Sequence, residues 1–527
     1  MSFTSYGFII FAAAVLMLYY ILPRRIRWIL LLVSGLVFYA FSGVKGFFFI
    51  IATLITIYTA TFIIDRINSK EFDKSSFEHV EDKDIIKAAK DRFRSAQKRN
   101  AAIVTAVCVV INLALILLVR FSSLVAVLGI SFYTLQSFGY LFDVKRKKYP
   151  REKNFFKLAL FLTFFPQLVQ GPINRYDLLS KTLYDGAEGR DKFKDISFGL
   201  LRMAWGFFKK LVIADRISIA LASIVEAKGE GIYVLAAVLF YAIRLYGDFT
   251  GGIDIALGFS RALGIEMSEN FERPYFSKSI AEFWRRWHIT LGTWMKDYIF
   301  YPISVSKLSL KISKSARQRL GNGLGKRIPV YLSTIAVWLL TGLWHGLTAN
   351  FIVWGLLNCF IILISQEFGP LYKKFKMRFP KIKGSVIYGI FETVRTFFLM
   401  GFLRMLDVYT NVGEYFSKLF GIFSNFIPDG FTFSSFGQLG LKTSDFIIVF
   451  AGCALIFAVS LINEILSKKG TSLENMLSRT GEGSSSEGRL SASALVPIAA
   501  AVLFAVVIIF GAYGRGFDIQ DFIYTRF

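Results

Sequence analysis

The stretch SIAEFWRRWHITLGTWMKDYIFYP, residues 279–302, and the stretch LLTGLWHGLTANF, residues 339–351, contain two of the three histidines among 527 residues. These are His288 and His345, and each follows a tryptophan. His345 ends an apolar run that begins at Ile328, where an imidazole is costly unless it is hydrogen-bonded or takes part in chemistry. Because histidine titrates near neutral pH, His345 is a candidate for proton transfer. A histidine that is hydrogen-bonded between helices is the alternative.

The composition around these stretches is that of a membrane protein. Hydrophobic residues make up 54% of the chain, aromatic residues make up 17%, and the mean hydropathy is +0.51. Apolar runs of about twenty residues, long enough to cross a bilayer as a helix, recur along the sequence. We therefore expect an all-α polytopic membrane protein with a single multi-pass domain over residues 1–527. The run at residues 6–22 is followed by three arginines, which favours a retained span over a cleaved signal.

The net charge of +25 would suggest a nucleic-acid partner if the protein were soluble. Here the Lys and Arg residues gather in short segments between apolar runs, as they do in the cytoplasmic loops of membrane proteins. Residues 303–327 contain seven Lys or Arg, residues 371–383 contain six, and neither segment contains an acid. We expect these segments and the mixed-charge segment 65–100 inside the cell, both chain termini outside the plasma membrane, and no nucleic-acid partner.

The alternation of apolar runs and charges also predicts where the remaining spans lie. A helical hairpin with His345 near its turn is expected between the two basic segments. A Ser/Gly-rich linker is expected at 466–493 on the cytoplasmic side, and an extracytoplasmic tail at 514–527. The other expected spans are at about 28–41, 46–64, 101–119, 121–142, 386–407, 445–465 and 495–513.

Cysteines and histidines give no sign of a metal or disulfide site. Cys108, Cys359 and Cys453 fall inside apolar runs and have no paired spacing, which favours small core residues. Three histidines that are remote in sequence make a poor metal-ligand set. We expect no metal.

Two apolar segments carry polar or helix-breaking residues. In the segment 155–172, Pro166 interrupts the run and Pro172 closes it, which fits either a cavity wall or a simple helix end. Asp248 and Asp254 lie on either side of two adjacent glycines. Carboxylates at membrane depth usually face a bundle interior or a polar cavity, although the glycines could also mark a surface loop with both aspartates solvated.

The stretch 279–302 alternates charged and aromatic residues too closely for an ordinary span. A helix through it would place four side chains on one face: Trp284, Trp287, His288 and Leu291. This pattern suits a re-entrant or interfacial helix with the histidine directed inward. An aromatic belt that only anchors the chain in lipid is the alternative.

Several motifs together resemble the membrane-bound O-acyltransferase family. They are PQLVQGPINRY at 166–176, YGDFTGGIDIALG at 246–258, ENFERPY followed by FSKSIAEFWRRWHITLGTWMKDYIFYP over 269–302, and LTGLWHG at 340–346. They resemble most the bacterial branch that serves alginate O-acetylation, teichoic-acid D-alanylation and peptidoglycan O-acetylation. The resemblance covers a core of about residues 120–360.

The resemblance implies a ring of transmembrane and re-entrant helices around a central tunnel. It implies that His345 is the catalytic histidine and His288 the second signature histidine. The tail FIYTRF is similar to a Phe-x-Tyr ending in this branch, which makes Tyr524 a candidate acyl relay, although Thr525 and Arg526 depart from the usual pattern. The residues expected to line the tunnel or to contact substrate are Trp344, Trp284, Arg285, Arg286, Asp248, Asp254, Gln167 and Pro172.

The expected reaction moves an acyl group, with acetyl preferred, from a cytoplasmic thioester to hydroxyls of an extracytoplasmic polysaccharide or cell-wall polymer. A neutral His345 would act as base, and His288 or an indole N–H would orient it or polarise the carbonyl. The donor would be acetyl-CoA or an acyl carrier protein, with no tightly bound cofactor. Expected partners are membrane lipid, that donor, an extracytoplasmic acyltransferase and the polymer. The alternatives are D-alanyl transfer and a proton-coupled transporter in which Asp248, Asp254 and the histidines form a proton relay.

Overall fold

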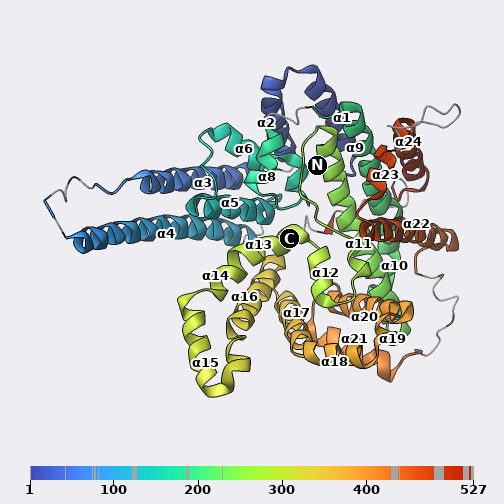
Figure 1. Cartoon of the computed structure of the whole chain (residues 1–527). Helices are drawn as coiled ribbons and strands as arrows, with labels where there is room; N and C mark the ends of the chain where they lie inside the picture. The colour runs from blue at the N-terminus through green and yellow to red at the C-terminus, as the bar shows by residue number, and fades with distance from the viewer. Residues whose placement is uncertain are drawn as a thin grey trace. The chain divides into compact units, whose positions relative to one another are not determined.

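The computed structural model is helical, as the sequence predicts (Figure 1). Within the described residues there is no named strand, and seven helices are long and apolar enough to cross a membrane. The prediction of an all-α polytopic membrane protein is confirmed. The structure describes residues 2–41, 43–73, 75, 79–80, 82–121, 127–184, 189–227, 229–428, 432, 437, 439–479, 492–513 and 522–523.

The chain divides into two compact units, each considered by itself. The first contains Ser5–Arg190 and Leu263–Ser268, and the second contains Ser2–Thr4, Asp191–Ala262 and Glu269–Phe527. The helices of the first unit are α1 (Tyr6–Ile21), α2 (Arg24–Ala40), α3 (Gly46–Ser69), α4 (Lys83–Phe121), α5 (Ile130–Lys145), α6 (Phe155–Thr163), α7 (Phe165–Leu168) and α8 (Tyr176–Leu183).

The second unit holds the remaining elements, including two π-helical segments, η2 and η4. They are α9 (Lys192–Phe207), η2 (Phe208–Ala214), α10 (Asp215–Glu226), α11 (Ile232–Ala262), η3 (Pro274–Phe276), α12 (Ile280–Arg286), α13 (Ile289–Met295), η4 (Lys296–Phe300), α14 (Tyr301–Ser304), α15 (Lys307–Gly325), α16 (Ile328–His345), α17 (Ala349–Glu367), α18 (Gly369–Arg378), α19 (Pro380–Lys383), α20 (Val386–Arg404), η5 (Met405–Asp407), α21 (Val412–Ser424), α22 (Thr443–Lys468), α23 (Leu473–Arg479) and α24 (Ala492–Phe510).

In the first unit, the expected span at about 121–142 is replaced by a shorter, buried helix. Its counterpart, α5, has 16 residues, and nearly all of its side chains are buried in the protein. At about 1.5 Å per residue it is roughly 24 Å long, less than a ~30 Å hydrocarbon core. The helix is therefore part of the protein core rather than a lipid-facing span.

The break at Pro166 separates α6 from α7. Proline cannot donate a backbone hydrogen bond, so carbonyl groups of the preceding turn need other partners. The Gln167 side chain supplies one by donating to the carbonyl of Phe161. A polar side chain inside this apolar segment therefore supplies a hydrogen-bond partner for a backbone carbonyl at the helix break.

In the second unit, α11 runs without interruption through the two adjacent glycines (Figure 1). The surface-loop interpretation of the glycines is therefore wrong. The reason is packing: a Cβ atom on Gly206 of α9 would lie 2.6 Å from the carbonyl oxygen of Gly251. Glycine allows the two backbones to approach this closely, and Asp248 and Asp254 are held in the interior of the unit as the sequence suggested.

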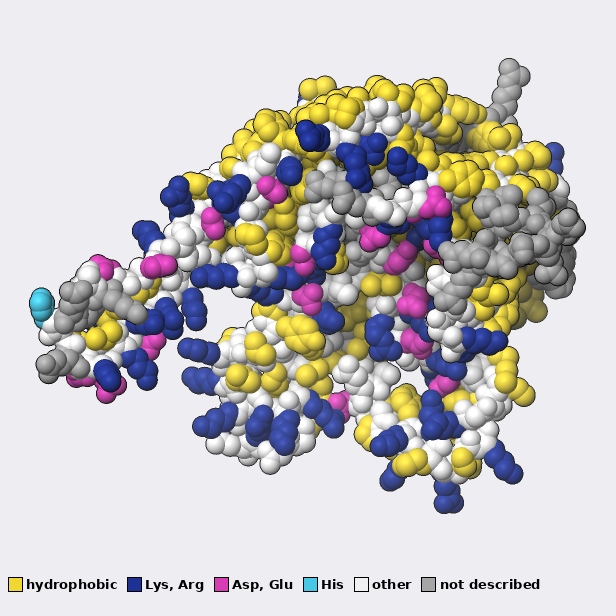
Figure 2. Space-filling model, turned by 45° about the horizontal axis from the view of Figure 1, so that its top comes forward, with side chains coloured by type: hydrophobic (Ala, Val, Ile, Leu, Met, Phe, Trp, Pro, Cys, Tyr) yellow, Lys and Arg dark blue, Asp and Glu magenta, His cyan; other side chains and the backbone are white. Residues whose placement is uncertain are grey.

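The expected hairpin around His345 is present as α16 and α17, which lie side by side in Figure 1. The basic segments on either side of it are helical rather than irregular loops. Lys and Arg side chains gather over α15 and over α18 with α19 in Figure 2.

Candidate active site

The backbone around His288 does not form the continuous helix expected over residues 279–302. Helix α12 ends at Arg286, Trp287 is extended, and the next helix begins at Ile289. Trp287 forms an antiparallel bridge with Phe271, and the amide of Ile289 donates to the carbonyl of Asn270 at 2.9 Å. These contacts replace helical hydrogen bonds, so the expected shared helical face is wrong.

His288 adopts a left-handed conformation, with φ 47° and ψ 52°. A non-glycine residue in this region is uncommon and costs about 1–3 kcal/mol, and such residues cluster at functional sites. The bridge to Phe271 fixes the chain on the N-terminal side of His288. The strained turn therefore sets the direction of the imidazole.

Asn270 holds the imidazole of His288. Its Oδ1 atom accepts the backbone N–H of Thr290 at 3.1 Å and the Thr290 hydroxyl at 2.9 Å, and it lies 3.2 Å from His288 Nδ1. A backbone N–H can only donate, so this atom of Asn270 is the oxygen and His288 Nδ1 carries the proton. In the neutral ring, Nε2 is then the basic nitrogen. Burial and the Arg404 charge lower the pKa of His288 to about 3, which keeps the ring neutral at physiological pH.

His345 is buried at the end of α16 and is surrounded by aromatic rings. Its ring centre lies 5.0 Å from that of Trp344 and 4.9 Å from that of Trp354. Trp344 also contacts His288, with ring centres 5.9 Å apart. Trp344 thus contacts both histidines.

The two histidines line one cavity of about 580 Å³. Trp284 and Arg285, both expected in the site, line it as well. The size falls in the range of roughly 300–1,000 Å³ typical of small-molecule sites. The structure therefore brings together four residues that lie up to sixty-one positions apart in the sequence, counting from Trp284 to His345.

Arg404 also lines this cavity and was missed from the sequence. Its guanidinium carbon lies 4.6 Å from the ring centre of Trp354, 5.4 Å from Trp284 and 5.7 Å from Trp287. Its Nη1 atom is 3.3 Å from a carboxylate oxygen of Asp407. The available signal was an arginine at the end of an apolar span. A cation in an aromatic cage can stabilise negative charge that develops nearby.

Three residues predicted for the site have other roles in the second unit. Arg286 pairs with Glu464 at 3.1 Å and does not line the histidine cavity. Asp248 pairs with Lys210 at 2.7 Å, and Asp254 pairs with Lys209 at 2.5 Å. The aspartates are therefore partnered by lysines of η2 and are not part of the cavity lining.

Gln167 and Pro172 are in the first unit. Gln167 accepts a hydrogen bond from Asn174 at 3.1 Å, and the Pro172 carbonyl accepts bonds from Asn174 at 3.2 Å and Gln136 at 3.4 Å. These hydrogen bonds hold together the segment that follows the helix break described above.

Tyr524 lies outside the described residues. Its two preceding neighbours, Phe522 and Ile523, are described. The amide of Ile523 donates to Asp248 at 2.9 Å, and the buried ring of Phe522 lies 4.6 Å from the Lys210 ammonium. This short piece of the tail is attached to the ion pair of α11.

In the part of the chain that the structure describes, no three His, Cys, Asp or Glu side chains form a group that could hold a metal ion. The three cysteines are unpaired.

The all-helical membrane fold agrees with the family that sequence comparisons identify. The model of the membrane-bound O-acyltransferase family matches residues 117–318 and 322–405, more than half of the chain. The chain belongs to the membrane-bound O-acyltransferase family. The resemblance inferred from the motifs is confirmed, and the matched region contains His288, His345 and Arg404.

Three curated relatives are similar to this chain. A probable alginate O-acetylase of Pseudomonas syringae pv. tomato is 35% identical over 46% of this chain and 43% of its own length. A peptidoglycan O-acetyltransferase of Helicobacter pylori is 32% identical, over 49% of this chain and 51% of the relative. A teichoic acid D-alanyltransferase of Bacillus subtilis is 28% identical, over 48% and 62%. The chain thus spans about half the length of these relatives.

Replacing the residue that holds His288 gives a structural prediction. In Asn270→Ala the buried amide and hydroxyl of Thr290 lose their acceptor, which is expected to lower the free energy of unfolding by about 1–3 kcal/mol. Thermal unfolding of the purified protein in detergent measures the effect. The matched control is Asn322→Ala at an exposed position of α15, expected to stay within about 0.5 kcal/mol of the parent. Equal stability of the two variants would contradict the role of Asn270.

Proposed function

We propose that this protein is an O-acyltransferase that moves an acyl group from a cytoplasmic thioester to a hydroxyl of an extracytoplasmic polysaccharide or cell-wall polymer. The observation that carries the proposal is the single cavity that His288 and His345 line, within the region matched by the family model. The names of the relatives support a polymer acceptor, since they refer to alginate, peptidoglycan and teichoic acid.

The residues of the cavity supply the chemistry for this reaction. The acceptor hydroxyl attacks the thioester carbonyl carbon while His345 takes the hydroxyl proton. A carbon–oxygen bond forms, the carbon–sulfur bond breaks, and the proton passes from the imidazolium to the leaving thiolate. Since His288 Nδ1 donates to Asn270, its Nε2 is the ring nitrogen that can accept a hydrogen bond, and we assign it the role of orienting the hydroxyl or His345. The Arg404 charge then stabilises the developing oxyanion.

Acetyl is the acyl group we favour. The relatives with acetyl-transfer names are 35% and 32% identical, compared with 28% for the D-alanyltransferase. Acetyl-CoA or an acylated carrier protein would serve as the donor, and D-alanyl transfer to teichoic acid remains the second candidate. A transporter is less well supported, because Asp248 and Asp254 pair with Lys210 and Lys209 instead of joining the histidines in a relay.

We propose that the protein lies in the plasma membrane with its basic helices, α15 and α18, on the cytoplasmic side. Single cysteines placed in α15 or α18, with the native cysteines replaced, are predicted to react with a membrane-impermeant maleimide only after the cells are opened, because Lys and Arg resist translocation. A cysteine near position 526 is predicted to react in intact cells. Labelling of the α15 position from outside would contradict this orientation.

His345→Ala is predicted to lower polymer acylation by about 10²–10⁴-fold, since a general base typically contributes that factor. Mass spectrometry of envelope polymers from deletion strains that express each variant measures the effect. His79→Ala is the matched control, because His79 is exposed and far from the site in the sequence. Protein level and membrane insertion are expected to stay normal in both variants. Wild-type acylation by His345→Ala would refute the assignment, and loss of the protein would favour a structural histidine.

The tail is proposed to pass the acyl group to a separate extracytoplasmic transferase through Tyr524. The attachment of Ile523 to Asp248 supports a fixed position for the residues just before Tyr524. A phenol, with a pKa of about 10, leaves an ester more readily than a sugar alkoxide and so suits a relay. The alternative is that the aromatic residues of the tail only anchor it in the membrane interface.

Tyr524→Phe separates these alternatives because it keeps the ring and removes the nucleophile. The relay predicts loss of polymer acylation at normal protein level, whereas Thr525→Ala, the neighbouring control, stays active. Full polymer acylation by Tyr524→Phe would eliminate the relay while leaving the membrane reaction at His345 intact.

A further inference from the structure

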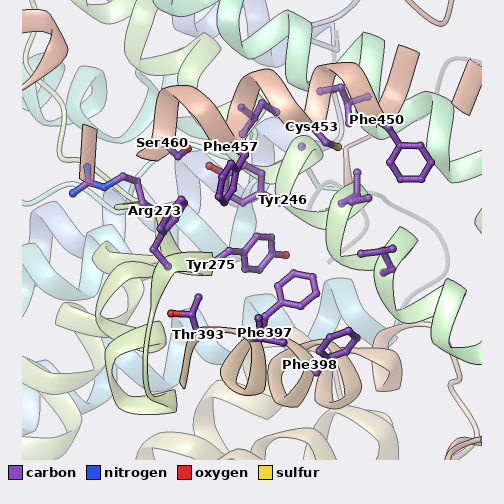
Figure 3. Close-up of a pocket in the computed structure, with 17 residues that line it drawn as sticks. Tyr246, Arg273, Tyr275, Thr393, Phe397, Phe398, Phe450, Cys453, Phe457 and Ser460 are labelled. Atoms are coloured by element: carbon purple, nitrogen blue, oxygen red, sulfur yellow. The ribbon is translucent and has the colours of Figure 1, made fainter. Parts of the chain in front are cut away.

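A second cavity in the second unit, separate from the histidines, lies among α11, α20 and α22 (Figure 3). Its volume is about 460 Å³, and it shares no lining residue with the histidine cavity among the described residues. Its wall is made mostly of aromatic and aliphatic side chains. We call it the apolar chamber; the labelled members in Figure 3 are Tyr246, Arg273, Tyr275, Thr393, Phe397, Phe398, Phe450, Cys453, Phe457 and Ser460.

The apolar chamber opens toward the place where lipid would lie. All three helices around it are long and apolar enough to cross a membrane. Four lining side chains are 38–58% exposed: Phe398, Phe450, Val394 and Phe457. Hydrocarbon is the solvent around such helices, so an apolar chain can enter the chamber without crossing a polar barrier.

One end of the apolar chamber continues into a polar one. A cavity of about 150 Å³, the polar chamber, shares the residues Tyr246, Arg273 and Ser460 with it. In Figure 3, Arg273 lies at one end of the apolar chamber and Phe450 lies at the other. The two chambers therefore form one amphipathic site, with Arg273 and two hydroxyl-bearing residues at the junction.

The polar chamber carries balanced charge. Three basic residues (Arg202, Lys209 and Arg273) and three acidic residues (Asp254, Glu269 and Glu272) line it, so their formal charges cancel. The carboxylates of Glu269 and Glu272 are the most accessible, with side-chain exposures of 59% and 56%. A single anion would face these carboxylates at close range, which is unfavourable. A group that carries both signs matches the lining.

We propose that the two chambers bind a zwitterionic phospholipid. One acyl chain occupies the apolar chamber, and the headgroup lies in the polar chamber. The phosphate accepts hydrogen bonds from Arg273 and the Ser460 hydroxyl at the junction, and the headgroup ammonium faces Glu269 and Glu272. An ion pair with Glu464 of α22, at 2.9 Å, holds the Arg273 guanidinium in position for this contact. The site is independent of acyl transfer at His345.

Photocrosslinking of the full-length chain tests the apolar chamber. The protein is reconstituted in phosphatidylglycerol nanodiscs that contain a small fraction of phosphatidylethanolamine with a diazirine on one acyl chain. After irradiation, mass spectrometry is expected to find crosslinks on chamber residues such as Phe397 and Phe457. Crosslinks spread evenly over the exposed faces of the spans would overturn the proposal.

Two variants of α22 sharpen this test. Cys453→Trp places a large ring in the apolar chamber and is expected to abolish crosslinking to its walls. Ile447→Trp adds the same ring at a position that is 63% exposed and does not line the chamber, and it is expected to crosslink like the parent. Thermal unfolding confirms that both variants are folded. Equal crosslinking of chamber residues in the two variants would contradict the proposal.

Competition in the unmodified protein tests the headgroup. Unlabelled phosphatidylethanolamine is expected to reduce crosslinking to the chamber residues, whereas the same amount of additional phosphatidylglycerol is not. Equal competition by the two lipids would overturn the match between a zwitterionic headgroup and the balanced charges. This measurement needs no variant, so the ion pair between Arg273 and Glu464 stays intact.

Discussion

The second unit depends on the partnering of one buried cation. The Lys210 side chain has no exposed surface, and its ammonium lies 2.7 Å from Asp248 of α11 and 2.7 Å from Asp215 of α10. Removing the Lys210 ammonium would leave both carboxylates without this cation in an apolar interior, and breaking a buried pair in this way costs about 3–5 kcal/mol. The same pair receives the tail, because Ile523 donates to Asp248 and Phe522 covers Lys210. Three helical segments and the end of the described chain thus meet at one ammonium group.

Backbone that departs from a regular α-helix sets the positions of Lys210 and of His288. The π-helical segment η2 contains both Lys209 and Lys210, which reach different carboxylates of α11. At the histidine cavity, the left-handed His288 separates two short helices and Asn270 fixes its ring. Departures from regular helix cost energy and persist where surrounding contacts fix them. In this protein those contacts are ion pairs in one place and a backbone bridge in the other.

Two arginines of the second unit, Arg404 and Arg273, are stabilised in different ways. The difference distinguishes the proposed acyl-transfer site from the proposed lipid site. Arg404 is surrounded by three tryptophan rings and one aspartate, so much of its charge faces aromatic surface beside the histidine cavity. Arg273 is held by glutamates where an apolar chamber meets a polar one. The first arrangement suits the transient negative charge of acyl transfer, and the second suits a resident headgroup that carries both signs.

The sequence by itself determined the class of fold, the family and the identity of the two histidines. A helix that spans a bilayer must form its backbone hydrogen bonds within itself, and its side chains must be apolar. Apolar runs bounded by Lys/Arg segments therefore predict most of the spanning helices directly. The tertiary structure alone decided the break at His288, the continuity of α11 through its glycines, and the roles of Asp248 and Arg404. Each depends on a partner distant in the chain: Phe271 for Trp287, Gly206 for Gly251, Lys210 for Asp248 and the tryptophans for Arg404. Helical periodicity describes contacts within about four residues, so it cannot reveal pairings that form when distant segments pack.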